Sequence, residues 1–246
     1  MWAPPLKQRL VMLTCPGREK QAFETAEAFR RSGIPPQLDE LIIYSDGRAE
    51  LPQWMGGNWQ HENLWDHSQG NLAAFVRILT LSRIHGVDYL FFVEDDVRPC
   101  KNALQRMYDV GVPLGCAFTT FFDMKEFYPG APSGLYNVPV RGIDGRGFWG
   151  MQALCINGAV LREIFDSKHM HERRKDLKSH SDIVLMEAVE KLGFKYYAAH
   201  VPSLVEHVGH NSSSIWKFDE HGISRTATNF PGEDFDALAL NDIVHL

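Results

Sequence analysis

Short apolar runs alternate with amphipathic stretches along the first half of the chain. The runs 9–15, 41–44 and 89–93 are too short for buried helices and are typical of strands covered on both faces. Between them, residues 19–31 and 71–85 place apolar side chains along one helical face. Strands that alternate with helices at this spacing predict right-handed βαβ units and a mostly parallel sheet.

The second half of the chain carries similar patterns. Strands are expected at 115–122, 150–157, 194–199 and 203–208, and helices at 103–110, 159–165 and 181–192. Residues 47–70 and 123–147 lack periodicity and read as long connections, the second as a loop or a small hairpin. The tail from residue 219 is polar and acidic. Because no linker interrupts the chain, we expect one α/β domain with a twisted sheet flanked by helices.

The strand at 89–93 runs directly into three carboxylates, Glu94, Asp95 and Asp96. Three acidic side chains at the end of a buried strand repel one another unless a cation or a network of donors lies between them. The carboxyl ends of strands in an open α/β sheet are also where ligands bind. A divalent cation held by carboxylates and substrate phosphates is one interpretation, and a solvated loop is the other.

A second candidate site lies late in the chain, where residues 201–208 lead His207 and His210 into a glycine-containing turn. Imidazole is a good ligand for manganese or zinc, and the hydroxyl groups of Ser212 and Ser213 suit phosphate oxygens. Two histidines on a loop also fit a plain surface position. Beside a carboxylate site that still needs ligands, one of them is expected to bind the cation.

Asp182 lies near the expected start of the helix 181–192. An aspartate in this position caps a helix or complements its dipole. The functional alternative is a general base that takes a proton from an acceptor hydroxyl. The pattern leaves both interpretations open.

Composition limits the class of protein. With 246 residues, of which 44% are hydrophobic and 23% charged, the chain has the profile of a globular enzyme. A net charge of −6 argues against a protein that coats nucleic acid or anionic membranes through charge alone. No apolar run approaches a membrane span and the first residues lack a signal core, so we expect a cytoplasmic protein. The cysteines are far apart, which predicts free buried thiols.

Several segments together resemble the nucleotide-sugar glycosyltransferases of the GT-A fold, above all small bacterial and phage members. The resemblance rests on the order and spacing of the segments 11–18, 71–97, 149–153, 181–185 and 202–209. It implies a Rossmann-like α/β fold in a single domain. It also implies a nucleotide-sugar half at about 8–112, an acceptor half at about 113–218 and a C-terminal tail at 219–246.

The resemblance implies roles for individual residues. Glu94-Asp95-Asp96 stands where the family has its Asp-x-Asp motif, with Asp96 and His207 as ligands of Mn²⁺ or Mg²⁺. The residues expected around the nucleotide sugar are Thr14, Arg18, Asp46, Asn71, Glu94 and Asp95. The acceptor side is expected to include Trp149, Gly150, Gln152, Arg173, Arg174 and Lys175, and further phosphate contacts are expected from His210, Ser212 and Ser213.

These roles imply a metal-dependent hexosyltransferase that moves a sugar from a UDP-sugar to an acceptor hydroxyl. The cation neutralises the charge that develops on the leaving diphosphate. Asp182 matches the catalytic base of inverting members and would deprotonate the hydroxyl as it attacks the anomeric carbon. If Asp182 only caps its helix, a retaining mechanism remains as the alternative.

The acceptor is specified less closely. Residues 168–180 hold an excess of positive charge just before Asp182, and residues 123–149 interleave Arg141 and Arg146 with aromatic side chains. Basic and aromatic residues together suit a polyanion whose bases can stack. A hydroxymethylated DNA base, drawn out of the duplex by a phage-type enzyme in the host cytoplasm, is one candidate acceptor. A saccharide or lipid-linked glycan is the alternative, with the aromatics on sugar rings.

Two other classes compete with a transferase. The same carboxylates and histidines could form a metal-dependent phosphoesterase, which would need more ligands near the first strands. Residues 14–16 offer no acid or histidine there. A non-catalytic sugar-binding protein would gain nothing from the costly cluster at residues 94–96, and it predicts no Mn²⁺-dependent nucleotide binding.

Overall fold

The computed structural model describes residues 6–55, 58–122, 131–140, 150–173, 180–208, 227, 229–240 and 244–245. The strands are β1 (Gln8–Thr14), β2 (Glu40–Ser45), β3 (Trp54–Met55), β4 (Trp59–Asn63), β5 (Tyr89–Glu94), β6 (Val97–Pro99), β7 (Cys116–Thr120), β8 (Gly134–Pro139), β9 (Ala153–Asn157), β10 (Tyr196–Val201), β11 (Val205–His207) and β12 (Val244–His245). The helices are α1 (Glu19–Ser32), α2 (Asn71–Ile84), α3 (Ala103–Val110), α4 (Gly158–Asp166), α5 (Lys168–Arg173) and α6 (Ser181–Lys191), with a short 3-10 turn at Ala237–Ala239. The predicted α/β class is confirmed.

One large sheet organises these elements. Ten of the described strands join it in the order β12-β8-β10-β7-β9-β5-β1-β2-β4-β3, and parallel pairs outnumber antiparallel ones within it. The strands β4, β2, β1 and β5 are parallel to one another, whereas β3 runs antiparallel to β4, and β9 runs antiparallel between β5 and β7. Because β1 has β2 on one side and β5 on the other, the strand order changes direction at β1.

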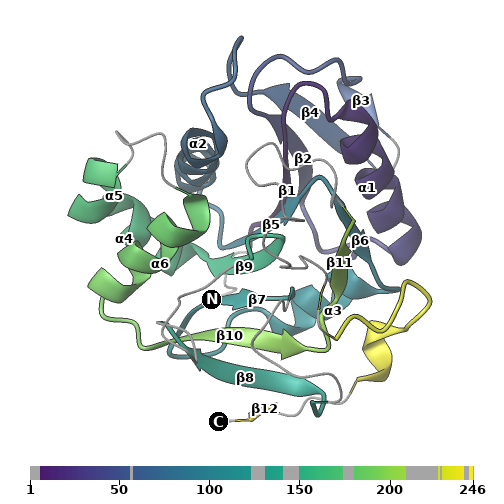
Figure 1. Cartoon of the computed structure of the whole chain (residues 1–246), viewed down its shortest axis with the longest axis vertical. Coiled ribbons are helices and arrows are strands. Elements are labelled where there is room, and N and C mark those ends of the chain that lie inside the picture. Colours follow the sequence, from purple (N-terminus) through teal and green to yellow (C-terminus); the bar gives the residue numbers. More distant parts are fainter. Residues whose placement is uncertain are drawn as a thin grey trace, which may run out of the picture.

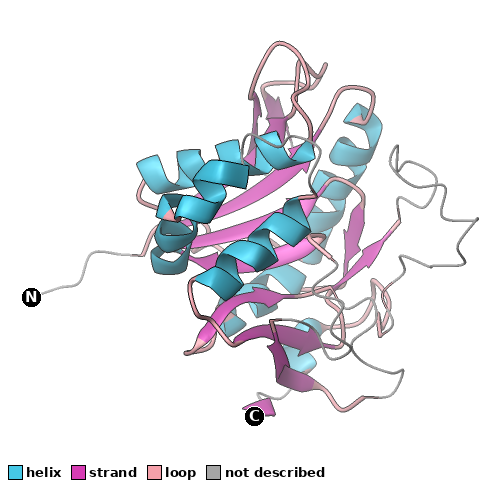
Figure 2. Ribbon diagram, turned by 60° about the vertical axis from the view of Figure 1, so that its left-hand side comes forward, coloured by secondary structure: helices cyan, strands magenta, loops and turns pink. Residues whose placement is uncertain are grey.

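Helices cover both faces of this sheet. Figure 1 shows α2, α4, α5 and α6 on one side and α1 and α3 on the other, and Figure 2 shows strands running between helices. The strand β1 explains the arrangement, since Val11 and Leu13 enter one core while Leu10 and Met12 enter the other. Burial on both faces is what the continuous apolar run predicted.

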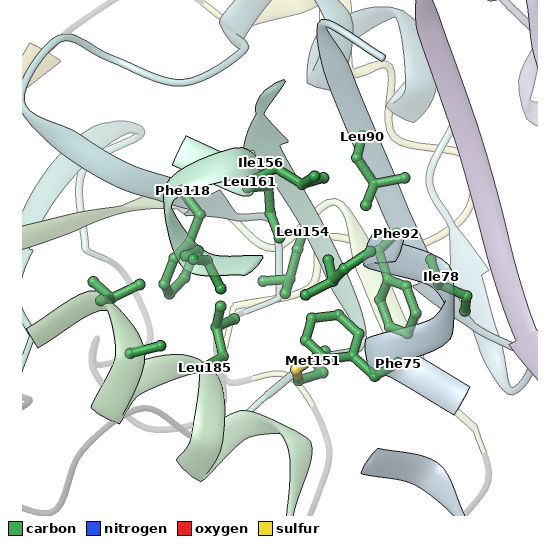
Figure 3. Close-up of a cluster of buried hydrophobic side chains, with 14 of the residues drawn as sticks. Phe75, Ile78, Leu90, Phe92, Phe118, Met151, Leu154, Ile156, Leu161 and Leu185 are labelled. Carbon is green, nitrogen blue, oxygen red and sulfur yellow. The ribbon is translucent and has the colours of Figure 1, made fainter. Parts of the chain in front are cut away.

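The core under α2 fixes the position of β5. The ring of Phe75 meets that of Phe92 edge-on, with ring centroids 5.5 Å apart. Leu154 of β9 and Leu185 of α6 belong to the same cluster (Figure 3). Because β5 is packed so closely, the residues that follow it emerge at a defined place on the edge of the sheet.

The shortest and most polar elements were not predicted. The strands β3 and β4 fall in the connection 47–70, β8 lies in the stretch expected as a loop or hairpin, and α5 precedes α6 without a predicted pattern. The strand β6 has three residues, too few to show any period. The four strands among these elements form through pairing with a neighbouring strand rather than through their own pattern.

Two expectations from composition can be compared with the structure. All four cysteines are free, with Cys100, Cys116 and Cys155 buried and Cys15 partly buried, as predicted. Among the helices of the described residues, none combines the length and the apolar character that crossing a bilayer requires.

Gly158 allows α4 to begin directly against the start of β5. A Cβ atom at Gly158 would lie 2.2 Å from the carbonyl oxygen of Val87, and the Gly158 N–H donates to the Asp88 carbonyl at 2.7 Å. We therefore expect Gly158→Ala to lower the free energy of unfolding by roughly 1–3 kcal/mol in a urea titration, because backbone has to move. The control Ala159→Ser, at the exposed next position, should change it by less than about 0.5 kcal/mol. Equal stability of the two variants would contradict the close approach.

Candidate functional site

The carboxyl ends of β1, β2 and β5 meet at one edge of the sheet, because these strands are parallel and adjacent. The register places Thr14 beside Ser45 and Leu13 beside Glu94. The residues just beyond the three strands therefore come together. Since the strand order changes direction at β1, this edge is also the crevice where open α/β sheets bind ligands.

Two aspartates in the turn after β5 are nearly fully buried, with Asp95 3% and Asp96 5% exposed. The hydroxyl of Thr14 donates to Asp95 Oδ2 at 2.5 Å. Arg18 donates to the two oxygens of Asp95 through Nε at 2.9 Å and Nη2 at 2.5 Å. The same Nη2 donates to Asp96 Oδ2 at 2.5 Å, so that one guanidinium bridges both carboxylates.

His207 reaches this turn from far along the chain. The strand β11 pairs antiparallel with β6, which puts His207 opposite Val97, and the N–H of Val208 donates to the Asp96 carbonyl at 2.8 Å. The His207 ring is 2% exposed, and its Nε2 lies 3.3 Å from Asp96 Oδ2. The small sheet of β6 and β11, seen beside α1 in Figure 1, thus brings an imidazole to the acidic turn.

Glu94, Asp96 and His207 form a group that suits a divalent cation. Each offers one ligand atom, and these atoms lie within 4.8 Å of one another. Two carboxylate oxygens and an imidazole nitrogen are a donor set that fits Mn²⁺ or a similar ion. Asp96 and His207 are buried and Glu94 is partly exposed. The structure therefore brings the two expected ligands together and adds Glu94 to them.

The two buried aspartates differ in their protonation behaviour. Burial raises the pKa of Asp95, and the nearby Arg18 and Thr14 offset only part of that rise. Burial also acts on Asp96, but its contacts with His207 and Arg18 outweigh burial and lower the pKa of Asp96 to about 2. Asp96 is therefore ionised at neutral pH, which is the form that binds a cation.

Asp46, after β2, organises the loop that leads into α2. Its carboxylate accepts hydrogen bonds from the Ser68 hydroxyl at 2.7 Å and from the N–H groups of Gln69 and Gly70, both at 2.8 Å. These contacts hold the start of α2 next to the end of β2. The expected contact of Asp46 with the nucleotide stays a prediction.

The helices α2 and α6 begin side by side at this edge. The Ser181 hydroxyl donates to Asn71 Oδ1 at 2.5 Å. The next residue, Asp182, is partly buried and accepts a hydrogen bond from the N–H of Ile183 at 2.8 Å. This bond complements the first turn of α6, as the helix-terminus interpretation expects. It also leaves Asp182 on the edge that carries the cation group, where its role as a base stays a prediction.

Gly150 and Gln152 border the cation group from the start of β9. The Gln152 carbonyl accepts a hydrogen bond from the N–H of Glu94 at 3.1 Å. The Gln152 side chain is buried, and its Oε1 has no hydrogen-bond partner within the described part of the chain. A Cβ atom at Gly150 would lie 3.0 Å from that oxygen. A buried amide oxygen without a partner is a group that a bound ligand could satisfy.

Arg173 is the last residue of α5 and contacts Glu187 of α6. Its Nε and Nη2 donate to the carboxylate of Glu187 at 2.9 and 3.0 Å, and His169 contacts the same carboxylate at 2.8 Å. Arg173 therefore ties two helices together, and an acceptor contact from it stays a prediction. The other expected site residues, Trp149, Arg174, Lys175, His210, Ser212 and Ser213, lie outside the described residues.

Thr25 supports the acidic turn and was not predicted. Its fully buried hydroxyl, on α1, contacts the carbonyl oxygens of Asp95 at 2.7 Å and Val97 at 3.1 Å. The signal was present in the sequence, because Thr25 interrupts the apolar helical face that includes Ala22 and Phe29. A hydroxyl on a buried helical face has to find an acceptor outside its own apolar surroundings.

Comparison with known proteins gives little beyond the fold. No protein-family profile and no curated protein matches the chain. Among solved structures, the chain is similar to the galactosyltransferase LgtC in complex with donor and acceptor sugar analogs. The identity is 14% and the TM-score 0.46, and the match covers 76% of this chain and 71% of that chain. At these values the similarity does not decide an activity, and function has to follow from the site.

Thr14→Val removes the hydroxyl that donates to Asp95 and keeps the shape of the side chain. We expect the free energy of unfolding, measured with urea at neutral pH, to fall by about 1.5–3 kcal/mol, because a buried carboxyl group loses a donor. The control is Thr80→Val, whose hydroxyl donates to the Val76 carbonyl within α2 at 2.8 Å. A loss in Thr14→Val no larger than in the control would show that this hydroxyl does not stabilise the acidic turn.

Proposed function

We propose that the protein is a metal-dependent glycosyltransferase, which moves a sugar from a nucleotide diphosphate donor, with UDP-sugars expected, to an acceptor hydroxyl. The observation that supports this proposal is the group Glu94, Asp96 and His207 in the crevice between β1 and β5. Three protein ligands leave coordination positions of a divalent cation open. The phosphate oxygens of a nucleotide diphosphate are suited to fill them.

The residues in and around this group would each contact a different part of the bound donor. Glu94, Asp96 and His207 would hold Mn²⁺ or Mg²⁺, which as a Lewis acid neutralises charge on the leaving diphosphate. Arg18 lies beside the same carboxylates, and its planar guanidinium suits phosphate oxygens as well. Gln152 offers its buried amide oxygen to a sugar hydroxyl.

Asp182 is the proposed general base. The contact between Ser181 and Asn71 holds the start of α6 on the edge of the sheet that carries the cation group. From there Asp182 would take the proton of the acceptor hydroxyl as that oxygen attacks the anomeric carbon. Attack opposite the leaving diphosphate inverts the anomeric centre.

For the acceptor we propose the hydroxyl of a saccharide, free or lipid-linked. The basic stretch that made DNA a candidate is partly engaged with acidic residues, because Arg173 binds Glu187 and Lys168 lies 3.7 Å from Glu172. A phosphoesterase with two metals is less well supported, since the described residues contain one candidate metal group and the end of β1 contributes Thr14 and Arg18.

Asp96→Asn should abolish Mn²⁺-dependent nucleotide binding, because the buried anionic ligand is lost. In wild-type protein, UDP with Mn²⁺ at about 100 times the dissociation constant should raise the melting temperature by about 5–10 °C. The variant should show no such rise. Asp109→Asn, which changes an exposed carboxylate on α3, should keep the full rise. A rise in Asp96→Asn equal to that of the wild type would overturn the site.

Asp182→Asn should keep donor binding and lose transfer. Removal of a general base lowers the rate by about 10²–10⁴-fold, whereas the melting-temperature rise with UDP and Mn²⁺ should be unchanged. Transfer is measured by UDP release in the presence of saccharides, lipid-linked glycans and hydroxymethylated DNA. Glu190→Gln, an exposed change on the same helix, is the control. Retained transfer in Asp182→Asn would leave Asp182 as a helix-terminus residue, and transfer to DNA alone would replace the saccharide acceptor.

A further inference from the structure

Arg18 binds the cation group through the same oxygen that faces His207. Its Nη2 lies 2.5 Å from Asp96 Oδ2 and 2.5 Å from Asp95 Oδ1. The Nε2 of His207 lies 3.3 Å from that Asp96 oxygen. An internal cation, the guanidinium of Arg18, is thus already bound where Asp96 and His207 would hold a metal ion.

A metal ion between Asp96 and His207 would compete with this guanidinium. Two positive charges within bonding distance of one carboxylate oxygen repel each other strongly, the more so in a buried site. Binding of the ion therefore favours the departure of Arg18 from Asp96.

Arg18 is placed so that it can move. Its side chain is 20% exposed, and the residue lies just before α1, in the loop after β1. Asp95 keeps the hydrogen bond from Thr14 when Arg18 turns away. After the movement, Thr14 is still a partner of Asp95 and the metal ion is a partner of Asp96, so both buried carboxylates remain compensated.

We propose that Arg18 is exchanged between Asp96 and the diphosphate of the donor, so that metal ion and donor bind cooperatively. The exchange rests on the proposed function, because it needs a diphosphate as the second partner of Arg18. A guanidinium binds phosphate with the same fork geometry as carboxylate, so little is lost in the exchange. Without a diphosphate, the metal ion has to displace the Arg18 guanidinium from Asp96 with no gain of phosphate contacts, so the protein holds the metal ion weakly.

A simpler role for Arg18 is to neutralise the two aspartates from a fixed place. Two controls separate this role from the exchange. Arg18→Lys keeps the positive charge but loses the fork that bridges both carboxylates. Arg98→Gln removes a positive charge two residues beyond Asp96, where the guanidinium pairs with Glu24 at 3.0 Å. If the effect came from charge alone, Arg18→Lys would leave the affinity for the metal ion unchanged, and Arg98→Gln would increase it.

The test is the affinity of the whole protein for Mn²⁺, followed by the electron paramagnetic resonance signal of the free ion, with and without UDP. Without UDP, Arg18→Gln should bind Mn²⁺ at least about tenfold more tightly than wild type, Arg18→Lys should lie between them, and Arg98→Gln should match wild type. UDP should then strengthen Mn²⁺ binding by wild type about tenfold more than it strengthens binding by Arg18→Gln. If Arg18→Gln does not fold, Arg18→Lys decides the comparison.

Each contrary result has a separate meaning. Unchanged Mn²⁺ affinity in both Arg18 variants overturns the exchange, and it leaves the proposed function intact if UDP still binds with Mn²⁺. If Arg98→Gln increases the affinity for Mn²⁺ as much as Arg18→Gln does, the effect comes from charge alone, and the exchange is overturned as well. If wild type binds Mn²⁺ but not UDP, the proposed donor is wrong, and the comparison without UDP still shows whether Arg18 competes with the ion. Absence of Mn²⁺ binding in every variant overturns both proposals.

Discussion

The burial of two adjacent carboxylates is the constraint on which the site depends. A buried charge without a partner costs several kcal/mol, so Asp95 and Asp96 require donors from elsewhere in the chain. Arg18 comes from the loop after β1, and His207 comes from β11. Thr25 of α1 binds the backbone of the same turn. The two sheets and α1 are thus held together by the need to compensate one acidic turn.

The patterns that predicted the central elements are those with enough residues to show a period. The strand β5 and the helix α2 were predicted close to their observed bounds, because a continuous apolar run and a long amphipathic stretch have few alternative structures. The strand β4, with Glu62 and Asn63 exposed, carries no such signal and depends on its parallel partner β2. The order of strands in the sheet depends on contacts between distant residues, which the local patterns do not contain.

The site was predictable where chemistry follows directly from chain position, and less so where it depends on side-chain direction. Asp96 could be inferred as a candidate ligand because it closely follows a buried strand, and His207 because a cation site in need of ligands favours a nearby imidazole. The bridging by Arg18 depends on the geometry of two turns that are 77 residues apart in sequence. A local excess of positive charge suggested an acceptor contact for Arg173, yet a partner across the helix pair, Glu187, engages it. Charge counts do not reveal such pairs.

The antiparallel direction of β9 determines how two parts of the candidate site, the cation group and Gln152, are joined. Because β9 is antiparallel to β5, its first residues rather than its last lie at the crevice, and Gln152 sits opposite Glu94. The spacing between the cation group and Gln152 is set by main-chain hydrogen bonds of one strand pair. Substitution of side chains leaves those bonds in place, whereas a slip of one residue would turn Gln152 to the other face. Substituted side chains could therefore change which molecules the site binds, whereas the distance between the cation group and Gln152 stays the same.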